Sequence, residues 1–538
     1  MNPVKVLIFF CSFCFILFTS CCKESKPCDE IKPDSFDLYN EVDFKFLIYK
    51  NDIFFCKSDS LDYRLLSLKS TCNTEFSRGR KPFEYGDHIV ILKDTMGNDM
   101  YLPSDTHLIK LTKSRYIKDI FSFKGGEILV IEYLDDNGIY LLRPNEKVET
   151  RICEFLGKIN GVLFDTESEN LIISYDNHLI LYNILNYQER EIANNIRGEK
   201  LNPFLFGYYV YFVNNDTSEY FQVFKTNMKS NYESSLVLSL DYDICLPKIK
   251  DSFLYFIELN HGEYLLKKKC FETNEVESIT KSGVVYNYDF YNDSTIALVY
   301  SNINTPRELF LYSELEKSMT AGSEKSILNH IEPQFIRGTT KNSSAYILRD
   351  TISKIKGIIL YIHPDIHSNF SPRWDALLMN LCKNGYMLVA PNYPMSSGFG
   401  KSFYNSTILQ AFADIVFWKE YIRTNYSGFP LYCMSVSSGN ILMEALVLTE
   451  PENIKGAVSI FGVPGANDGS KCIVPTLYIL GENDIIIDFC ERFSELNNYI
   501  INKSLFSIIS YSNEGHGFRQ KENIDDALNK ILKHFCIN

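Results

Sequence analysis

Residues 430–449 read PLYCMSVSSGNILMEALVLT, an apolar run that breaks on a turn of serine and glycine and then resumes. The first run has the length of a buried strand, and the run over 440–449 has that of a helix. Where a strand, a sharp turn and a helix follow one another directly, a serine on the turn can project its hydroxyl from the end of the strand. The stretch therefore predicts a parallel sheet with Ser437 as a candidate nucleophile.

The same alternation continues through the second half of the chain. Strands that alternate with helical runs indicate a parallel sheet with helices on both faces, and its ligand chemistry belongs at the carboxyl ends of the strands. We therefore predict an α/β domain over 323–538. Its predicted strands are 357–363, 385–392, 430–435, 454–462, 475–480 and 506–511, and its predicted helices are 371–384, 409–425, 440–449, 484–500 and 523–536.

Two candidate partners of Ser437 follow it in the chain. Asp484 comes directly after one predicted strand, and His516 comes after the last one. The order serine, aspartate, histidine is that of α/β-hydrolases, in which the histidine takes the serine proton and the aspartate holds the imidazole tautomer. The amide of Ser438, at the start of a helix, would face the oxyanion. The alternatives are a capping role for Asp484 and a solvated loop position for His516.

The first half of the chain has a different pattern, because it contains no long stretch of helical period. A short phrase recurs instead: a β-run, a turn rich in Asn, Lys, Glu or Thr, and a second β-run. Its seven copies begin 37 to 45 residues apart, at Tyr63, Met100, Ile139, Leu179, Tyr220, Tyr264 and Leu309.

A repeat of this period is typical of a propeller. One four-stranded blade cannot bury both of its faces, so blades stack in a ring that closes on itself. We predict an all-β propeller of seven blades over 42–322, with apolar segments just upstream of each phrase supplying the inner strands. A β-sandwich or a solenoid is the alternative.

The composition agrees with a sheet-rich protein of more than one domain. A chain of 538 residues exceeds what one hydrophobic core usually supports, and 35 Tyr and 39 Phe favour strands. A net charge of −13 argues against a nucleic-acid partner. Of the 15 cysteines, those beyond the N-terminal apolar segment form no C-x-x-C pair, and no motif indicates a metal or an organic cofactor.

The N-terminus has the features of an export signal. Residues 1–20 combine a single lysine with the apolar run VLIFFCSFCFILFTS, which is too short and too close to the end for an ordinary membrane span. Residues 18–20 and Cys21 resemble a bacterial lipoprotein signal, with Cys21 as the lipidated residue, Cys22 as a weaker competitor and 21–41 as a linker. A plain secretory signal or an uncleaved anchor is the alternative. All three interpretations place the mature chain outside the cytoplasm, on the periplasmic or cell-surface side.

Further segments of the α/β domain carry longer motifs, at 384–386 (NGY), 392–400 (NYPMSSGFG), 481–484 (GEND) and 514–518 (EGHGF). Together with the turn at Ser437, they resemble the prolyl oligopeptidase family of serine peptidases, whose N-Y-R-G-S-x-G-Y-G is similar to the second motif. A propeller ahead of an α/β-hydrolase domain is the arrangement of that family. The resemblance implies a serine peptidase with Ser437, Asp484 and His516 as catalytic residues.

The chain also departs from the family's motifs. Residues 363–366 read HPDI where the family has H-G-G-P. Because proline has no N–H, the amide of Asp365 is the remaining candidate for the oxyanion donor on this loop, although its own carboxylate would oppose the developing negative charge. Pro394 and Met395 replace the arginine and glycine of N-Y-R-G, and Ser435 replaces the first glycine of G-x-S-x-G.

The spacing of the candidate residues bears on specificity. Ser437 and Asp484 are 47 residues apart, and Asp484 and His516 are 32 apart. The second gap is normal for the family, but the first is short, because 460–480 runs almost directly from one strand to the next. A preference for proline is therefore not carried over.

Three functions are open on the sequence. The first is a lipid-anchored serine peptidase that hydrolyses short peptides through an acyl-enzyme on Ser437. The second is an esterase or deacylase of small esters on the same scaffold. The third is a surface binding lipoprotein whose hydrolase half is catalytically degenerate. The sequence does not indicate an oligomeric state.

Overall fold

The computed structural model describes the strands between residues 42 and 154, and then residues 159–537 apart from 166, 231, 322–329, 339–342, 466–472, 485 and 500–504. The predicted signal over 1–20, the linker with Cys21 and the predicted domain boundary at residue 322 lie outside the described residues. The chain separates into two compact units. One comprises Asn40–Tyr300 and Arg307–Glu324, and the other includes Ser301–Pro306 and Lys325–Asn538.

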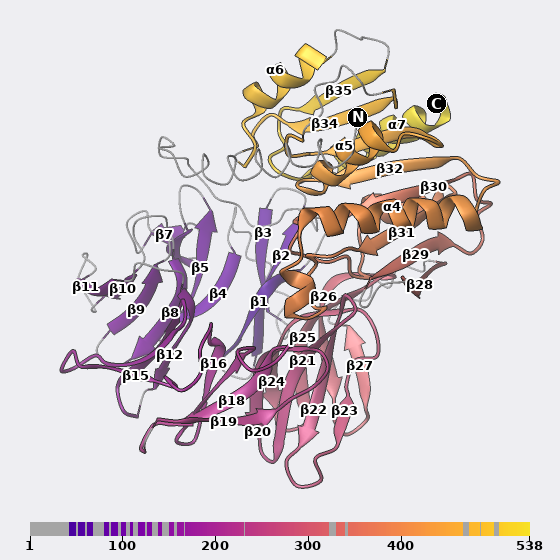
Figure 1. Cartoon of the computed structure of the whole chain (residues 1–538). Coiled ribbons are helices and arrows are strands. Elements are labelled where there is room, and N and C mark those ends of the chain that lie inside the picture. Colours follow the sequence, from indigo (N-terminus) through magenta and orange to yellow (C-terminus); the bar gives the residue numbers. More distant parts are fainter. Residues whose placement is uncertain are drawn as a thin grey trace. The chain divides into compact units, whose positions relative to one another are not determined.

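The described strands of the first unit form six sheets of consecutive strands (Figure 1). Five of them are single blades, and the sixth, of eight strands, comprises the last two blades, which are joined by one parallel residue pair, Tyr264 with Val284. The first three blades contain β1 (Val42–Tyr49), β2 (Asp52–Asp59) and β3 (Asp62–Ser67); β4 (Arg80–Tyr85), β5 (His88–Asp94), β6 (Asn98–Pro103) and β7 (Leu108–Lys110); and β8 (Ile117–Phe123), β9 (Gly126–Ile131), β10 (Gly138–Leu142) and β11 (Thr150–Glu154).

The next two blades contain β12 (Ile159–Asp165), β13 (Asn170–Tyr175), β14 (His178–Asn183) and β15 (Glu189–Ile192); and β16 (Leu201–Phe206), β17 (Tyr209–Asn214), β18 (Gln222–Asn227) and β19 (Ser234–Leu238). The last two contain β20 (Asp243–Lys250), β21 (Phe253–Asn260), β22 (Glu263–Cys270) and β23 (Val276–Ser278); and β24 (Val284–Asn292), β25 (Thr295–Asn302), β26 (Thr305–Ser313) and β27 (Ser318–Ala321). The predicted propeller of seven blades is confirmed.

The first strands of the blades lie against one another. Among them β1 contacts β4, β4 contacts β8, β12 contacts β16, and β16 contacts β20. The ring closes where β24, the first strand of the last blade, contacts β1. In the blades described with four strands, the repeated phrase of the sequence forms the two outer strands, and the apolar segments upstream of it form the second strands.

The first strands did not stand out in the sequence, and their pairing gives the reason. In each of the first six blades, the register between the first and second strands shifts within the ladder. A bulge inserts an extra residue, which interrupts the alternation of apolar and polar side chains by which a strand is recognised.

The second strands show why the blades stack. Successive side chains of a strand point to opposite faces, so β13 serves two cores at once. Leu171 and Ile173 pack with Ile139 of the preceding blade. Ile172, between them, packs with Phe212 of the following blade. A second strand such as β13 is therefore buried on both faces because it has a neighbouring blade on each side.

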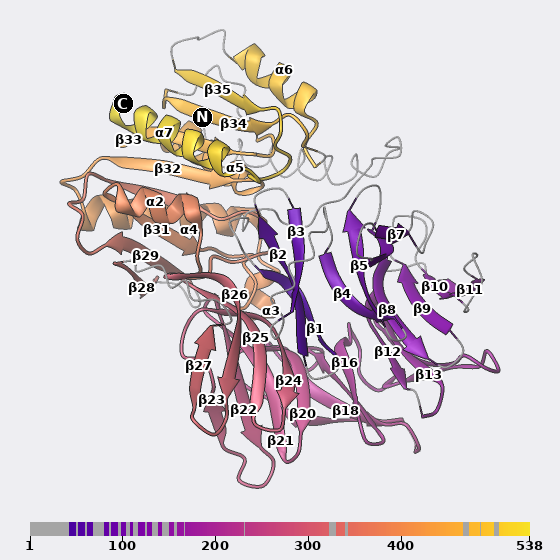
Figure 2. The ribbon, with the colours of Figure 1, turned by 180° about the vertical axis from the view of Figure 1, so that it is seen from behind.

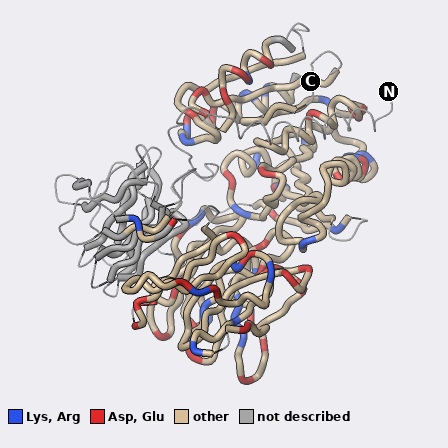
Figure 3. Tube along the Cα trace, turned by 60° about the vertical axis from the view of Figure 1, so that its left-hand side comes forward, with Lys and Arg blue, Asp and Glu red and all other residues tan. Residues whose placement is uncertain are grey.

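Basic and acidic residues are interspersed along the described trace of the propeller (Figure 3). The lysine run on β22 shows the pattern at close range. Lys267 Nζ lies 2.6 Å from Glu258 Oε1, and Lys268 pairs with Glu314. Two lysines of the run are thus paired with carboxylates.

The second unit is one sheet of eight strands with helices on both faces. The strand order is β28-β29-β31-β30-β32-β33-β34-β35, in which β28, β29 and β31 pair antiparallel and all other pairs are parallel. The strands are β28 (Ile331–Arg337), β29 (Ser344–Asp350), β30 (Gly357–Ile362), β31 (Tyr386–Asn392), β32 (Leu431–Val436), β33 (Ile454–Ile460), β34 (Thr476–Gly481) and β35 (Phe506–Tyr511). The predicted α/β-hydrolase sheet is confirmed.

The described helices divide between the two faces of this sheet. They are α2 (Ala376–Lys383), α3 (Lys401–Tyr404), α4 (Ile408–Asn425), α5 (Gly439–Thr449), α6 (Phe489–Tyr499) and α7 (Lys521–Ile537). Figure 1 shows α4 along one face. There Trp418 of α4 and Leu442 of α5 belong to the same apolar core. Figure 2 shows α2 and α7 on the other face, where Leu381 and Phe535 meet. These two apolar layers hold the strand ends in place.

One carboxyl group lies within the helical layer. Asp414 of α4 is buried and accepts hydrogen bonds from Ser343 Oγ at 2.5 Å and from Trp418 Nε1 at 3.0 Å. Burial raises the pKa of Asp414 to about 6, even though both hydrogen bonds favour the charged form. The folded protein therefore holds a proton on this group at a pH where the unfolded chain has lost it.

This difference predicts how the stability of an Asp414→Asn variant varies with pH. The wild-type carboxyl destabilises the fold as pH rises from about 4 through 6, because ionisation in the buried site is opposed. From pH 4 to pH 7 the variant should gain about 2 to 3 kcal/mol in free energy of unfolding relative to the wild type. Denaturant unfolding at both values measures the gain, and Asp525→Asn on an exposed face of α7 is the control. An equal difference at both pH values would contradict it.

Candidate active site

Ser437 lies on a strained turn between β32 and α5. Its backbone has φ of +48°, in the left-handed region that non-glycine residues seldom adopt. The turn is held on both sides of the residue: Ser437 N–H donates to Ile460 O at 3.0 Å, and Val463 N–H donates to Ser437 O at 3.1 Å. The side chain is thereby directed from the carboxyl end of β32.

The next turn of chain is packed too closely for any side chain at Gly439. A β-carbon there would lie 2.6 Å from His363 O and 2.8 Å from Ile362 O, both backbone atoms at the end of β30. The first turn of α5 therefore touches the loop that follows β30. This contact brings the N-terminus of the helix, the positive end of its dipole, beside the candidate nucleophile.

The structure brings the three sequence-predicted residues together. His516 Nε2 lies 2.8 Å from Ser437 Oγ, and His516 Nδ1 lies 2.8 Å from Asp484 Oδ2. The His516 and Asp484 side chains are 13% and 5% exposed. With the carboxylate accepting from Nδ1–H, the free lone pair of the imidazole is on Nε2 and faces the serine hydroxyl.

Both loops that supply these partners are fixed by hydrogen bonds. The other oxygen of the acid, Asp484 Oδ1, accepts from the amides of Ile486 and Ile487, each at 2.9 Å. Asn483 N–H donates to Glu514 O at 2.9 Å, which ties the acid loop to the histidine loop. The capping role weighed for Asp484 from the sequence falls to Asp488 instead, whose Oδ1 accepts from Glu491 N–H at 2.8 Å at the start of α6.

Glu514 anchors the histidine loop to the start of α7. Its carboxylate accepts from Arg519 N–H at 2.7 Å, from Gln520 N–H at 3.0 Å and from Asn523 Nδ2 at 2.7 Å. Burial raises the pKa of Glu514, although these bonds favour its charged form. The residue was quoted in the sequence only as part of a motif, and the structure gives it a positioning role beside His516.

The candidate oxyanion donors come from two elements that touch. Ser438 is the N-cap residue of α5, and its amide is one candidate donor. The Ser438 hydroxyl accepts from Ile366 N–H at 3.2 Å. Asp365, one residue earlier, has φ of +50°, and its carboxylate Oδ1 accepts from His367 N–H at 3.0 Å. The sequence did not reveal that the Ser438 side chain fastens the loop that carries Asp365.

The loop after β30 is held by residues of the motif at 392–400. His363 is buried, its Nε2 lies 2.9 Å from Ser396 Oγ, and its ring stacks on Tyr393 with 4.3 Å between centroids. Burial lowers the pKa of His363 to about 4, so the imidazole is neutral near pH 7. Asn392 holds the far end of the loop through Phe370, accepting from its N–H at 2.6 Å and donating to its carbonyl at 3.1 Å.

Two departures from the family's motifs carry a structural cost. Asp365 and Met395 both stand where the resembling motifs have glycine, and their φ values are +50° and +93°. The backbone thus keeps a conformation that favours glycine although the glycine is absent. Such positions cost of order 1–3 kcal/mol each and persist where the surroundings hold them.

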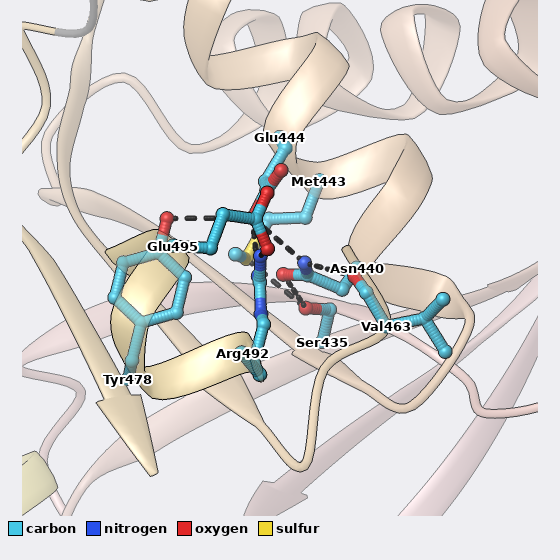
Figure 4. A network of polar contacts seen from close by, with 8 residues as sticks. All are labelled: Ser435, Asn440, Met443, Glu444, Val463, Tyr478, Arg492 and Glu495. Carbon is cyan, nitrogen blue, oxygen red and sulfur yellow. Dashed lines mark hydrogen bonds and ion pairs between the residues drawn. The ribbon is translucent and has the colours of Figure 1, made fainter. Parts of the chain in front are cut away.

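The structure also contains a buried ionic network that the sequence analysis missed. Glu444 and Arg492 pair at its centre (Figure 4). The signal in the sequence was a single glutamate inside the apolar run ILMEALVL of a predicted helix. Among the described residues, no group of three or more His, Cys, Asp or Glu side chains is placed to hold a metal ion.

Neither a family model nor a curated protein matches this sequence. Solved structures match its fold along nearly the whole chain. A Mycobacterium tuberculosis puromycin-hydrolyzing peptidase has a TM-score of 0.77 at 10% identity, covering 93% of this chain and 95% of that one. A structure from an analysis of two prolyl endopeptidases has a TM-score of 0.74 at 11% identity, covering 93% and 90%. An acylaminoacyl peptidase in complex with Z-Gly-Gly-Phe-chloromethyl ketone has a TM-score of 0.68 at 12% identity, covering 93% and 95%.

The fold is that of prolyl oligopeptidases and acylaminoacyl peptidases. At this level of identity the likeness concerns the arrangement of the propeller and the hydrolase sheet. What the site does is argued from its own residues.

The close approach at Gly439 predicts the effect of adding one methyl group. Gly439→Ala gains up to about 1 kcal/mol of helix propensity, but the new atom meets backbone oxygens that cannot turn away, which costs about 1 to 3 kcal/mol. We expect α5 to be displaced and the free energy of unfolding to fall, and denaturant unfolding measures that fall. Gly428→Ala is the control, because a β-carbon there meets nothing within 4 Å. If both variants unfold at the same denaturant concentration, the steric argument is wrong.

Proposed function

We propose that this chain is a serine hydrolase that cleaves short peptides through an acyl-enzyme on Ser437. The observation that carries the proposal is the hydrogen-bonded succession of Ser437 Oγ, the His516 imidazole and the Asp484 carboxylate. A hydroxyl within reach of a base, which is itself oriented by a third group, is the arrangement of an activated nucleophile.

In the proposed first step, Ser437 Oγ bonds to the carbonyl carbon of the substrate while its proton passes to His516 Nε2. Asp484 stabilises the imidazolium cation that forms. The amides of Ser438 and Asp365 are the proposed donors to the negative oxygen. The carbon–nitrogen bond then breaks, and the leaving amine takes the proton from His516. Water repeats the sequence on the acyl ester and restores the serine.

Short peptides are the proposed substrate class for two reasons. The motifs at 392–400 and 514–518 resemble those of a peptidase family, and the acylaminoacyl peptidase of the same fold binds a peptide chloromethyl ketone. One feature of the chain points toward esters instead. Pro364 has no N–H, so the oxyanion loop has one backbone donor fewer. Hydrolysis of an ester needs less stabilisation of the oxyanion than hydrolysis of an amide does.

A fluorophosphonate probe tests the nucleophile directly. We expect the wild-type protein to be labelled, and Ser437→Ala to lose the label completely. Ser507→Ala, at an exposed position of β35, should be labelled like the wild type. In turnover assays, removing Ser437 or His516 should each lower kcat by roughly 10³- to 10⁶-fold, since such residues act as a unit.

The outcomes of that experiment separate the candidate functions. A wild-type protein that is folded but takes no label would overturn the hydrolase proposal and favour a binding protein with a degenerate hydrolase half. If label is taken up, comparing peptide anilides with short-chain esters distinguishes a peptidase from an esterase or deacylase.

We also propose that the mature chain is exported and held at a membrane by a lipid on Cys21. The support is the apolar segment over 1–20 followed directly by this cysteine. In the part of the chain that the structure describes, none of the helices has the length and apolar character needed to cross a bilayer.

Cell fractionation tests the anchor. We expect the wild-type protein in the membrane fraction, and we expect Cys21→Ala to leave it, because one acyl-bearing residue supplies the attachment. Cys22→Ala is the matched control and should stay with the membrane. Globomycin should slow the processing of the wild type. Membrane association of Cys21→Ala without a change in mobility would contradict the proposal and indicate an uncleaved anchor.

A further inference from the structure

A buried ion pair joins the helix after the proposed nucleophile to the helix after the proposed acid. Glu444 lies on α5 and Arg492 on α6, and Glu444 Oε1 is 2.9 Å from Arg492 Nη2. Both side chains are 1% exposed. α5 begins two residues after Ser437, and α6 begins five residues after Asp484. The pair therefore fixes one of these helices against the other.

The pair also reaches the strand that leads to the acid loop. The hydroxyl of Tyr478, on β34, donates to Glu444 Oε1 at 3.4 Å, and the Arg492 guanidinium lies over the tyrosine ring at 5.5 Å from its centroid. Arg492 Nη1 in turn donates to Glu495 Oε2 at 2.8 Å. Figure 4 shows these side chains converging on the guanidinium from α5, α6 and β34.

One residue connects the pair to the turn of Ser437. Asn440 Nδ2 donates to Glu444 Oε1 at 2.8 Å and to Val463 O at 2.8 Å. The amide of Val463 donates back to Ser437 O at 3.1 Å. The two amide hydrogens of Asn440 are thus shared between the ion pair and the segment that holds the serine turn.

The same segment lies directly against the carboxylate. A β-carbon at Gly465 would be 2.2 Å from Glu444 Oε2, and one at Gly462 would be 2.8 Å from Asn440 Cγ. The chain after β33 passes over the pair at a distance that only glycine permits. Any shift of Glu444 is therefore passed on to the segment that bonds Ser437.

Stability alone does not account for two fully buried charges at this place. The cost of removing both from water offsets most of their attraction, so apolar residues of the same volume often serve the fold as well or better. What a paired carboxylate and guanidinium add is a fixed geometry, because their hydrogen bonds have defined directions. Here that geometry joins the loops that carry Ser437 and Asp484.

We propose that Glu444 and Arg492 are positioning residues, which hold α5 and α6 so that Ser437 and Asp484 keep their distances to His516. The inference rests on the proposed hydrolase function and adds to it a device that acts through neighbouring residues. Neither side chain needs to touch substrate. Loss of the pair should therefore lower kcat and leave KM unchanged.

Variants of the pair test this role. Glu444→Gln keeps an oxygen for Asn440 and Tyr478 but removes the buried charge opposite Arg492, which then keeps only its bond to Glu495. We expect the fluorophosphonate labelling rate and kcat to fall roughly 10- to 100-fold, the effect of misplacing a reacting group by about 1 Å. Glu444→Gln with Arg492→Met removes both charges and should recover melting temperature without recovering the rate. Arg492→Lys keeps a cation opposite Glu444, so it should lose less of the labelling rate than the double variant does.

A second buried cation of the same unit supplies the control. Lys419 of α4 has a side chain 2% exposed, and its Nζ lies 3.3 Å from Glu450 Oε2 and 2.8 Å from Glu450 O. It is engaged with none of the residues around Ser437 named above. We expect Lys419→Met to lower the melting temperature while the labelling rate of the folded protein stays at the wild-type value.

The outcomes separate this inference from the function on which it rests. Wild-type labelling rates in folded Glu444→Gln, or a rate that recovers with the melting temperature in the double variant, would overturn the positioning role and leave the hydrolase proposal intact. If Glu444→Gln does not fold, the uncharged double variant and Arg492→Lys still decide the matter through their rates. A folded wild type without label would overturn both.

Discussion

The left-handed backbone of Ser437 is the constraint on which the rest of the site depends. It turns the chain from β32 into α5 so sharply that the helix begins against the carbonyls at the end of β30, where only Gly439 fits. That approach sets the Ser438 hydroxyl on the amide of Ile366. It also directs the Ser437 hydroxyl at an imidazole whose other nitrogen is held by Asp484.

The strain is not confined to the serine. Asp365 and Met395 also have positive φ without being glycine. Asp365 lies on the loop after β30, and Met395 lies on the loop after the neighbouring strand β31. Their surroundings include a buried hydrogen bond between His363 and Ser396 and another from Phe370 N–H to Asn392 Oδ1. Such bonds, shielded from water, are expensive to break, which is how a fold keeps unfavourable backbone conformations in place.

Two kinds of packing position this site. In the hydrolase unit, helices cover both faces of the sheet with apolar side chains, and the buried ion pair between Glu444 and Arg492 adds direction to an otherwise non-directional core. In the propeller, the second strand β13 packs one face on the preceding blade and the other on the following blade, through Leu171 and Ile172. The propeller is therefore stabilised by repetition, and the hydrolase unit by a few defined contacts around one turn.

The sequence by itself determined the elements: the propeller from seven spaced phrases, the parallel sheet from alternating runs, and Ser437, Asp484 and His516 from their places after strands. Those features are local, so chain order carries them. Only the tertiary structure decided where the first strands bulge and which residue pairs with Glu444. It also decided that the Ser438 hydroxyl accepts from Ile366 N–H. Each depends on residues far apart in the chain, 48 positions for Glu444 and Arg492 and 72 for Ile366 and Ser438, and no local pattern records which distant group a side chain will meet.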